Sequence, residues 1–318
     1  MNLSKNPAAI MAAWEEALRP PVFAGLGGAQ AVKTFDFPEF LGVLYLQPTE
    51  PGVAQQVLLM YPRQEADGPR PGMVVPFYYP DYSCGYDLRT GAGAGAFGGK
   101  VIAPYARELV GRGYVVAATQ AYAFNYIPEP PGCVDRLDFK YWQAAAEELR
   151  RRHPGWSGVG KLVYDTRLAL DLLAADPAVD ASRLGMYGLS LGGKMAFMTA
   201  CLDRRIRAAA GIDFGLLWHQ TNWTDPWYWT EEEVAEFKRS GLDLELLLAA
   251  RDGLDFYLVA GLYDTSESMA ALERVRGLDR EWGHVRRIEG ENHASGHIPP
   301  PDAVEKAYRF LDQKLLKK

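Results

Sequence analysis

The stretch Gly188-Leu189-Ser190-Leu191-Gly192-Gly193 decides how the rest of this 318-residue chain is interpreted. A short apolar run, residues 184–187, precedes the stretch, and a run of small and apolar residues, 192–202, follows it. The first run is typical of a buried strand and the second of a helix. Ser190 is therefore predicted to lie on a sharp turn from a strand into a helix.

The glycines of this turn have a steric explanation. Side chains at positions 188 and 192 would collide with the neighbouring strand and helix backbone, whereas glycine leaves room. A serine on such a turn lies at a helix N-terminus, where amide groups such as that of Leu191 can stabilise an oxyanion. The G-x-S-x-G pattern is thus predicted to be a nucleophile elbow, with Ser190 as the nucleophile.

The composition is that of a soluble globular protein, with 48% hydrophobic and 23% charged residues. A net charge of −6 disfavours a nucleic-acid or anionic-membrane surface. The three cysteines, Cys84, Cys133 and Cys201, are too few and too scattered for a disulfide framework or a zinc site. Because we find no signal peptide and no membrane-spanning run, we expect a cytoplasmic location. We predict no cofactor, no metal, no nucleic-acid partner and no membrane partner.

The pattern of strands and helices changes along the chain. Early β-prone runs, separated by proline and glycine, suggest an antiparallel meander. From Gly72 onward apolar strands alternate with helices, which is typical of a mainly parallel sheet covered on both faces. The predicted strands are 33–37, 40–47, 57–63, 73–79, 114–119, 184–187, 206–212 and 256–261. The predicted helices are 7–18, 104–111, 163–174, 192–202, 266–276 and 302–315.

These elements predict an α/β fold with one doubly wound, mainly parallel sheet. We expect residues 1–318 to form a single domain with an N-terminal helical extension, 1–30. Long insertions follow three of the strands, at 80–100, 121–161 and 214–252, and the last is expected to form a cap or lid. Ligands of such sheets bind beyond the carboxyl ends of the strands, where Ser190 is predicted to lie.

A serine nucleophile needs a base, and histidine is the usual one. The chain has five histidines. His293 follows the strand-like residues 285–288 and precedes the final helix, so it is our choice. His297, four residues later, is the alternative. His153 and His284 lack this placement.

The base in turn needs an acidic partner that holds its tautomer. Asp264 comes just after the strand 256–261, and we select it as this acid. Asp213, at the end of the preceding strand, and Asp255, at the start of a strand, are the alternatives. The predicted triad is therefore Ser190, Asp264 and His293, each of which falls past the carboxyl end of a predicted strand.

Several motifs in this order resemble the α/β-hydrolase superfamily from residue 30 to the end of the chain. They are VYDTRLALD at 163–171, DASRLG at 180–185, the elbow with Lys194, and LDRRI at 202–206. The details are similar to the branch of acetylxylan esterases and dienelactone hydrolases. The chain order serine, aspartate, histidine is also the order of that superfamily.

The resemblance implies a serine esterase that works through an acyl-enzyme and needs no cofactor. It also implies that the acyl group is small, such as acetyl, on a carbohydrate or another polyol. Two alternatives stay open: a peptidase or amidase on the same fold, and a catalytically inactive hydrolase fold that acts as a binding protein. The expected partner is a small-molecule ester, and a homo-oligomer is an open possibility.

One segment departs from the pattern of the relatives. Many of them carry His-Gly after the third strand, where a backbone N–H completes the oxyanion hole, but this chain has Phe77-Tyr78-Tyr79-Pro80-Asp81. Pro80 has no N–H to donate. We expect Tyr79 to supply the second donor beside Leu191, with Tyr78 or Asp81 as alternatives. The hydroxyl group of a tyrosine could also replace the amide.

Two further segments carry recognisable patterns. Residues 93–98 form a G-x-G-x-x-G and Gly99-Lys100 resembles a phosphate loop, but neither context suits nucleotide binding, so a mobile lid is the better interpretation. The segment 218–229 is rich in tryptophan. Its rings either bind substrate or pack within the cap or a subunit interface. The candidate substrate-binding residues are Trp218, His219, Trp223 and Trp227.

Overall fold

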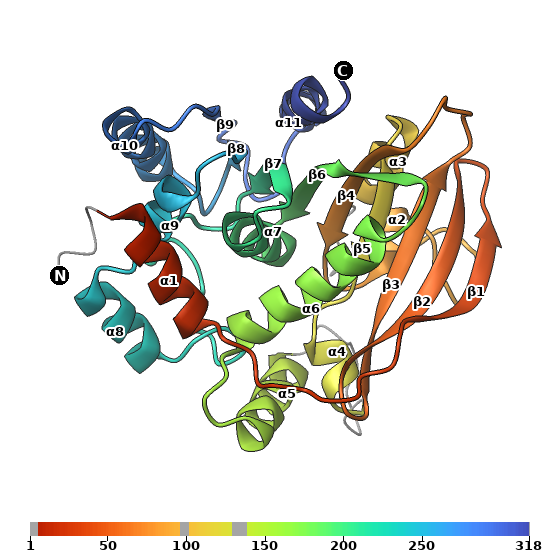
Figure 1. The fold of residues 1–318 in the computed structure, drawn as a ribbon, viewed down its shortest axis with the longest axis horizontal. Coiled ribbons are helices and arrows are strands. Elements are labelled where there is room, and N and C mark those ends of the chain that lie inside the picture. Colours follow the sequence, from red (N-terminus) through yellow and green to blue (C-terminus); the bar gives the residue numbers. More distant parts are fainter. Residues whose placement is uncertain (1–5, 96–101, 129–138, 318) are drawn as a thin grey trace. The chain divides into compact units, whose positions relative to one another are not determined.

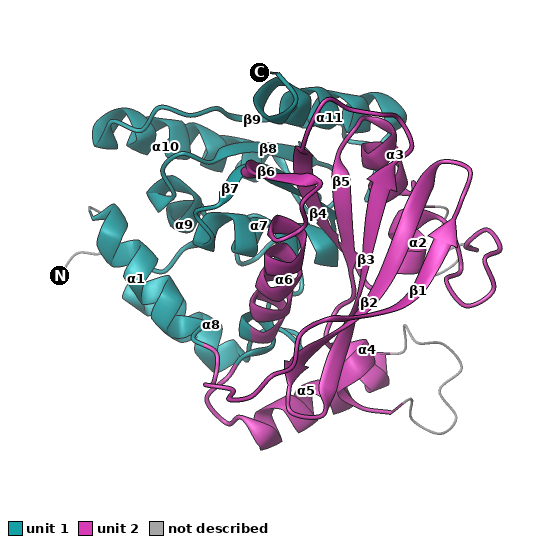
Figure 2. Ribbon diagram, turned by 45° about the vertical axis from the view of Figure 1, so that its right-hand side comes forward, with its two compact units in different colours: residues 1–19, 157–160, 185–318 teal, residues 20–156, 161–184 magenta. Residues whose placement is uncertain are grey.

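The computed structural model describes residues 6–95, 102–128 and 139–317, and its elements are labelled in Figure 1. Cys133 and part of the glycine tract, residues 96–99, lie outside the described residues. The chain divides into two compact units, coloured separately in Figure 2. The first unit comprises Met1–Arg19, Ser157–Gly160 and Gly185–Lys318, and the second comprises Pro20–Trp156 and Lys161–Leu184.

The strands of the second unit follow the order β1-β2-β3-β5-β4. The first three pair antiparallel, which confirms the predicted meander. β3 pairs antiparallel with β5, and β4 pairs parallel with β5, with Gly72 opposite Val115. β5 is buried throughout, as a strand covered on both faces should be. The bounds are β1 (Gln30–Asp36), β2 (Phe40–Glu50), β3 (Val53–Pro62), β4 (Arg70–Pro76) and β5 (Val115–Thr119).

The helices of the second unit include one that the sequence interpretation missed. Residues 121–161 were interpreted as an insertion, yet α5 occupies Phe139–Arg152 within them. Its buried residues recur with helical spacing, from Tyr141 and Trp142 to Leu149. The other helices are α2 (Pro80–Cys84), α3 (Tyr105–Gly111), α4 (Ala123–Tyr126) and α6 (Gly158–Ala174), the last beginning with residues of the first unit.

The sheet of the first unit follows the order β6-β7-β8-β9, with β6 (Val179–Leu189) belonging to this unit from Gly185 onward. β7 (Ile206–Ile212) and β8 (Asp255–Ala260) are parallel, and β9 (Ile288–Asn292) is parallel to β8. The last strand corrects our expectation, because we placed strand structure at 285–288. β9 has one neighbour in the sheet order, so its polar residues 289–292 need not be buried on both sides.

The helices of the first unit confirm the N-terminal helix and add two helices in the predicted cap. Trp14 of α1 is completely buried, so this extension is part of the core of the unit. The bounds are α1 (Pro7–Ala17), α7 (Leu191–Leu202), α8 (Glu231–Ser240), α9 (Leu244–Ala250), α10 (Ser266–Trp282) and α11 (Pro301–Leu315). Among the described residues, no helix combines the length and hydropathy that a membrane span requires.

Candidate active site

Ser190 stands between β6 and α7 with backbone angles φ 57° and ψ −118°. A residue other than glycine rarely adopts a positive φ, and such strain recurs at functional sites. The glycine at position 188 is required because a Cβ there would lie 2.1 Å from the carbonyl oxygen of Gly192. Gly193 is also constrained, since its Cβ would lie 2.7 Å from the Cβ of Phe214. The turn has the geometry of a nucleophile elbow.

The backbone of Ser190 is tied to the neighbouring strand. Its amide donates to the carbonyl oxygen of Ile212, the last residue of β7, at 2.9 Å. Asp213 is the next residue along the chain, so this bond places the elbow and Asp213 at the same end of the sheet. Leu191 is the first residue of α7, a helix of 12 residues. The N-terminus of that helix is where the predicted oxyanion donor belongs.

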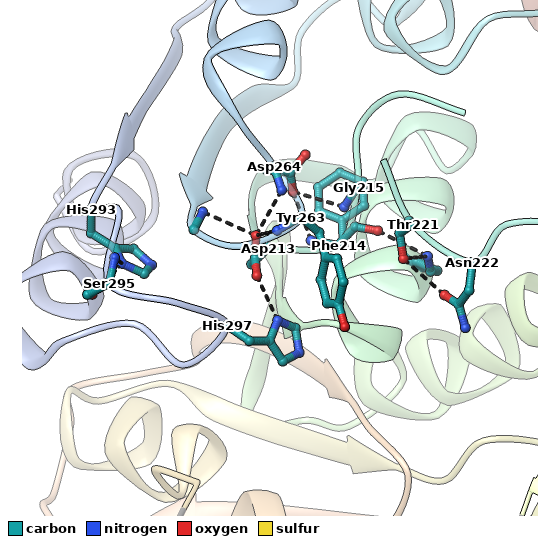
Figure 3. A network of polar contacts seen from close by, with 12 residues as sticks. Asp213, Phe214, Gly215, Thr221, Asn222, Tyr263, Asp264, His293, Ser295 and His297 are labelled. Atoms are coloured by element: carbon teal, nitrogen blue, oxygen red, sulfur yellow. Dashed lines mark hydrogen bonds and ion pairs between the residues drawn. The ribbon is translucent and has the colours of Figure 1, made fainter. Parts of the chain in front are cut away.

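Asp213 pairs with His297, and Figure 3 shows the contact. The distance between Asp213 Oδ2 and His297 Nδ1 is 2.7 Å. A carboxylate accepts a hydrogen bond, so Nδ1 carries the proton and Nε2 is left to accept one. The ring of Tyr263 lies edge-on to the imidazole, with 4.9 Å between centroids. This arrangement provides a base with a fixed tautomer.

The Asp213 side chain is itself held by backbone groups. Its Oδ1 atom accepts hydrogen bonds from the amides of Gly261, Tyr263 and Asp264, at 3.1, 2.8 and 2.9 Å. The side chain is completely buried. Three amides donate to one oxygen and His297 contacts the other. Both oxygens of this buried carboxylate therefore have hydrogen-bond partners.

Asp264, our predicted acid, has a different set of partners. Its Oδ2 accepts the amides of Phe214 and Gly215 at 2.8 and 2.9 Å. Its Oδ1 accepts the amide of Leu216 at 2.6 Å and the hydroxyl of Ser268 at 2.8 Å. Burial raises the pKa of this carboxyl, and the hydrogen bonds from the amides oppose that shift. The carboxylate therefore organises the backbone after β7.

His293, our predicted base, is not brought to Asp264. Its Nδ1 lies 2.7 Å from Ser295 Oγ and also accepts the Ser295 amide at 3.1 Å. The chain then turns through Ala294 and Gly296, whose φ angles are 52° and 101°. These two left-handed residues reverse the loop, so His297 meets an aspartate while His293 bonds locally. The alternatives Asp213 and His297 therefore form the pair that we had expected of Asp264 and His293.

Lys194 is a buried charged group that the sequence interpretation did not assign to the site. Its Nζ donates to the carbonyl of Phe214 at 3.1 Å and to Thr221 Oγ1 at 3.2 Å. The ammonium also lies 4.1 Å from the ring centroid of Trp223. Burial lowers the pKa of Lys194 to about 7. The sequence signal that could have indicated a buried lysine here is a single charged residue in the otherwise uncharged helix α7.

The candidate substrate-binding tryptophans lie mostly in a packed cluster. Trp218 stacks on Trp14 at 6.1 Å, and its indole N–H donates to the carbonyl of Leu242. Trp223 is completely buried, and its indole N–H donates to the carbonyl of Gly215 at 2.7 Å. Trp227 is 8% exposed. Packing within the unit, one of the two interpretations given above, therefore accounts for Trp218 and Trp223, and a buried ring cannot stack on a substrate in this conformation.

The remaining predicted site residues have other surroundings. His219 is exposed, and its Nε2 lies 2.9 Å from Glu267 Oε2 in a surface pair. Tyr79 precedes the first residue of α2, and its ring lies against that of Phe124 in a tilted arrangement, with 4.2 Å between centroids. Tyr79 belongs to the second unit, and its role as an oxyanion donor stays a prediction.

Two sequence comparisons relate the chain to known proteins. The model of the dienelactone hydrolase family matches residues 95–223, which include Ser190 and Asp213. The chain is 26% identical to YtaP of Bacillus subtilis (strain 168) over 224 residues, 66% of this chain and 68% of that protein. The chain has an α/β-hydrolase fold, and its sequence is similar to the dienelactone hydrolase family.

Solved structures with this fold cover nearly the whole chain. Acetyl xylan esterase 1 from Thermoanaerobacterium sp. JW/SL YS485 has a TM-score of 0.59 and 16% identity, covering 98% of this chain and 95% of that one. A glucuronoyl esterase from Solibacter usitatus has a TM-score of 0.65 and 14% identity, covering 96% of this chain and 91% of that one. At such identities the likeness establishes the fold.

Proposed function

We propose that this chain is a serine esterase in which Ser190 is the nucleophile, His297 the base and Asp213 the acid. The observation that carries the proposal is the 2.7 Å contact between His297 Nδ1 and Asp213 Oδ2. Asp213 directly follows Ile212, which accepts the amide of Ser190. A strained serine at a helix N-terminus and a carboxylate-bound imidazole are two of the parts that acyl transfer requires.

The reaction begins when His297 Nε2 takes the proton of the Ser190 hydroxyl as Oγ attacks the ester carbonyl. The amide of Leu191 stabilises the oxyanion that forms. His297 then donates the proton to the alcohol, which leaves. Water, activated by the same imidazole, attacks the acyl-enzyme and releases the acid and free Ser190. Asp213 keeps the proton on Nδ1 and stabilises the imidazolium throughout.

The proposed substrate is an ester of a carbohydrate or another polyol with a small acyl group. The resemblance to acetylxylan esterases supports an acetyl group. Two of the similar structures are named as an acetyl xylan esterase and a glucuronoyl esterase, which supports a substrate that contains a carbohydrate.

The test is ester hydrolysis by the wild type and Ser190→Ala at neutral pH. We expect p-nitrophenyl acetate turnover that falls to the uncatalysed background in the variant, because the acyl-enzyme cannot form. Butyrate and octanoate esters, acetylated xylo-oligosaccharides and a p-nitroanilide then define the acyl group, the alcohol and the preference for ester over amide. Equal turnover by both proteins would exclude Ser190 as the nucleophile.

A further inference from the structure

The peptide groups directly after Asp213 are held from two sides by the buried side chains of Asp264 and Lys194. The amide of Phe214 donates to Asp264 Oδ2 at 2.8 Å. The carbonyl oxygen of Phe214 accepts from Lys194 Nζ at 3.1 Å. Asp264 is completely buried and Lys194 is 3% exposed, so water competes little for these bonds. Both polar groups of one residue are thereby fixed.

Asp264 accepts hydrogen bonds from the amides of three consecutive residues. The amides of Phe214, Gly215 and Leu216 converge on its two oxygens, and Ser268 adds a fourth donor. Three successive amides can converge on one carboxylate only if the backbone turns sharply. A turn that presents successive amides to one anion is a nest, which a carboxylate of fixed position stabilises.

The turn begins at Asp213, whose φ is 42°. A residue other than glycine rarely adopts this left-handed conformation, and it persists only where its surroundings enforce it. The same conformation directs the Asp213 carboxylate so that Oδ1 receives three amides while Oδ2 receives His297. The strained backbone and the direction of the side chain are therefore linked.

We infer that Asp264 and Lys194 are positioning residues, which hold the backbone of residues 214–216 and thereby fix the Asp213 carboxylate against His297. Neither side chain touches the reacting atoms in this arrangement. The inference rests on the proposed function, because it assigns these residues to the same triad. Asp264, the aspartate after β8, thus has a positioning role and is not the acid that binds the histidine.

A double-mutant cycle separates positioning from direct participation. The four proteins are the wild type, Asp213→Asn, Asp264→Asn and the double variant, assayed with the best ester substrate. Asp264→Asn keeps the shape of the side chain but replaces an accepting oxygen with a donating amide. We expect kcat to fall about 100-fold with KM within about threefold, because a misplaced catalytic group lowers the rate more than binding. In the Asp213→Asn background the same change is expected to alter kcat less than threefold.

Three results of the cycle would overturn the inference. Wild-type kcat in Asp264→Asn would show that the backbone hold does not matter for the reaction. A similar loss in both backgrounds would show that Asp264 acts independently of Asp213, and a severe loss in Asp264→Asn beside a mild one in Asp213→Asn would make Asp264 the acid. Thermal unfolding of each variant confirms that folded protein is compared.

Lys194→Met provides a second test if Asp264→Asn does not fold. Methionine fills similar space but cannot donate to Phe214, so kcat is expected to fall about tenfold in the wild-type background and to stay within threefold in Asp213→Asn. An unchanged kcat in Lys194→Met would contradict the inference. Ser190→Ala is measured alongside: if it keeps full activity, the proposed function fails, whereas an inactive Ser190→Ala beside a fully active Asp264→Asn rejects only the positioning role.

Discussion

The loops after β7 and β8 begin alike but hold their aspartates differently. Each follows a largely buried strand, and each aspartate accepts three backbone amides from the other loop. At Asp213 all three amides meet Oδ1, so Oδ2 is available to His297. At Asp264 the amides occupy both oxygens and Ser268 joins them. Whether each aspartate can bind a histidine thus depends on which of its oxygens the neighbouring amides leave available.

The largest difference in activity is expected between variants of the two histidines. His297→Gln is expected to lower kcat/KM at least about 10⁴-fold, because no group then takes the proton of Ser190. His293→Gln, the matched control four residues away, is expected to stay within about threefold, since its Nδ1 bonds to the neighbouring Ser295 and not to an aspartate among the described residues. Steady-state kinetics with p-nitrophenyl acetate measures both. A larger loss in His293→Gln than in His297→Gln would favour His293 as the base, as we first expected.

A smaller effect is expected from the loop after β8. In Gly261→Ala the new Cβ would lie 2.3 Å from the carbonyl oxygen of Gly296, the residue before His297. Because the backbone must shift, we expect kcat to fall about 100-fold. Gly277→Ala is the control: its Cβ meets no atom nearer than 3.9 Å, and this helix substitution should stabilise the protein by about 0.5–1 kcal/mol. Equal kinetics for the two variants would show that the approach to Gly296 does not matter.

The last effect concerns the anchor of the loop after β7 and appears in stability, not in rate. Burial lowers the pKa of Lys194 from 10.5 to about 7, so between these values the unfolded chain binds a proton that the folded chain does not. The free energy of unfolding should therefore rise with pH across this window, by up to about 1.4 kcal/mol per pH unit from this group.

Lys194→Met should remove this contribution. Urea unfolding of the wild type and the variant from pH 7 to 10 gives the difference, in which the other titrating groups cancel. A difference that does not change with pH would mean that Lys194 keeps its ordinary pKa in the folded protein.

Much of the fold could be predicted because its signals are local. The apolar run 206–212 is the strand β7 without any change of bounds, and the helix expected at 192–202 begins one residue earlier. The expectation was wrong for β9, whose polar residues 289–292 belong to a strand at the end of the sheet order. Helix α5 was not predicted because it lies within the long segment 121–161, whose length between a predicted strand and a predicted helix favoured a loop.

The sequence by itself indicated the elbow, because Gly188 relieves a collision with Gly192, only four positions away. It also limited the acid and the base to a few aspartates and histidines after strand ends. Only the tertiary structure shows which of them pair, since Asp213 and His297 are 84 residues apart and meet through two loops. A hydrogen bond depends on the direction of a side chain, and here that direction follows from a left-handed backbone at Asp213 and a reversed loop before His297. No local sequence pattern predicts the left-handed conformation of Asp213 or the reversal of the loop before His297.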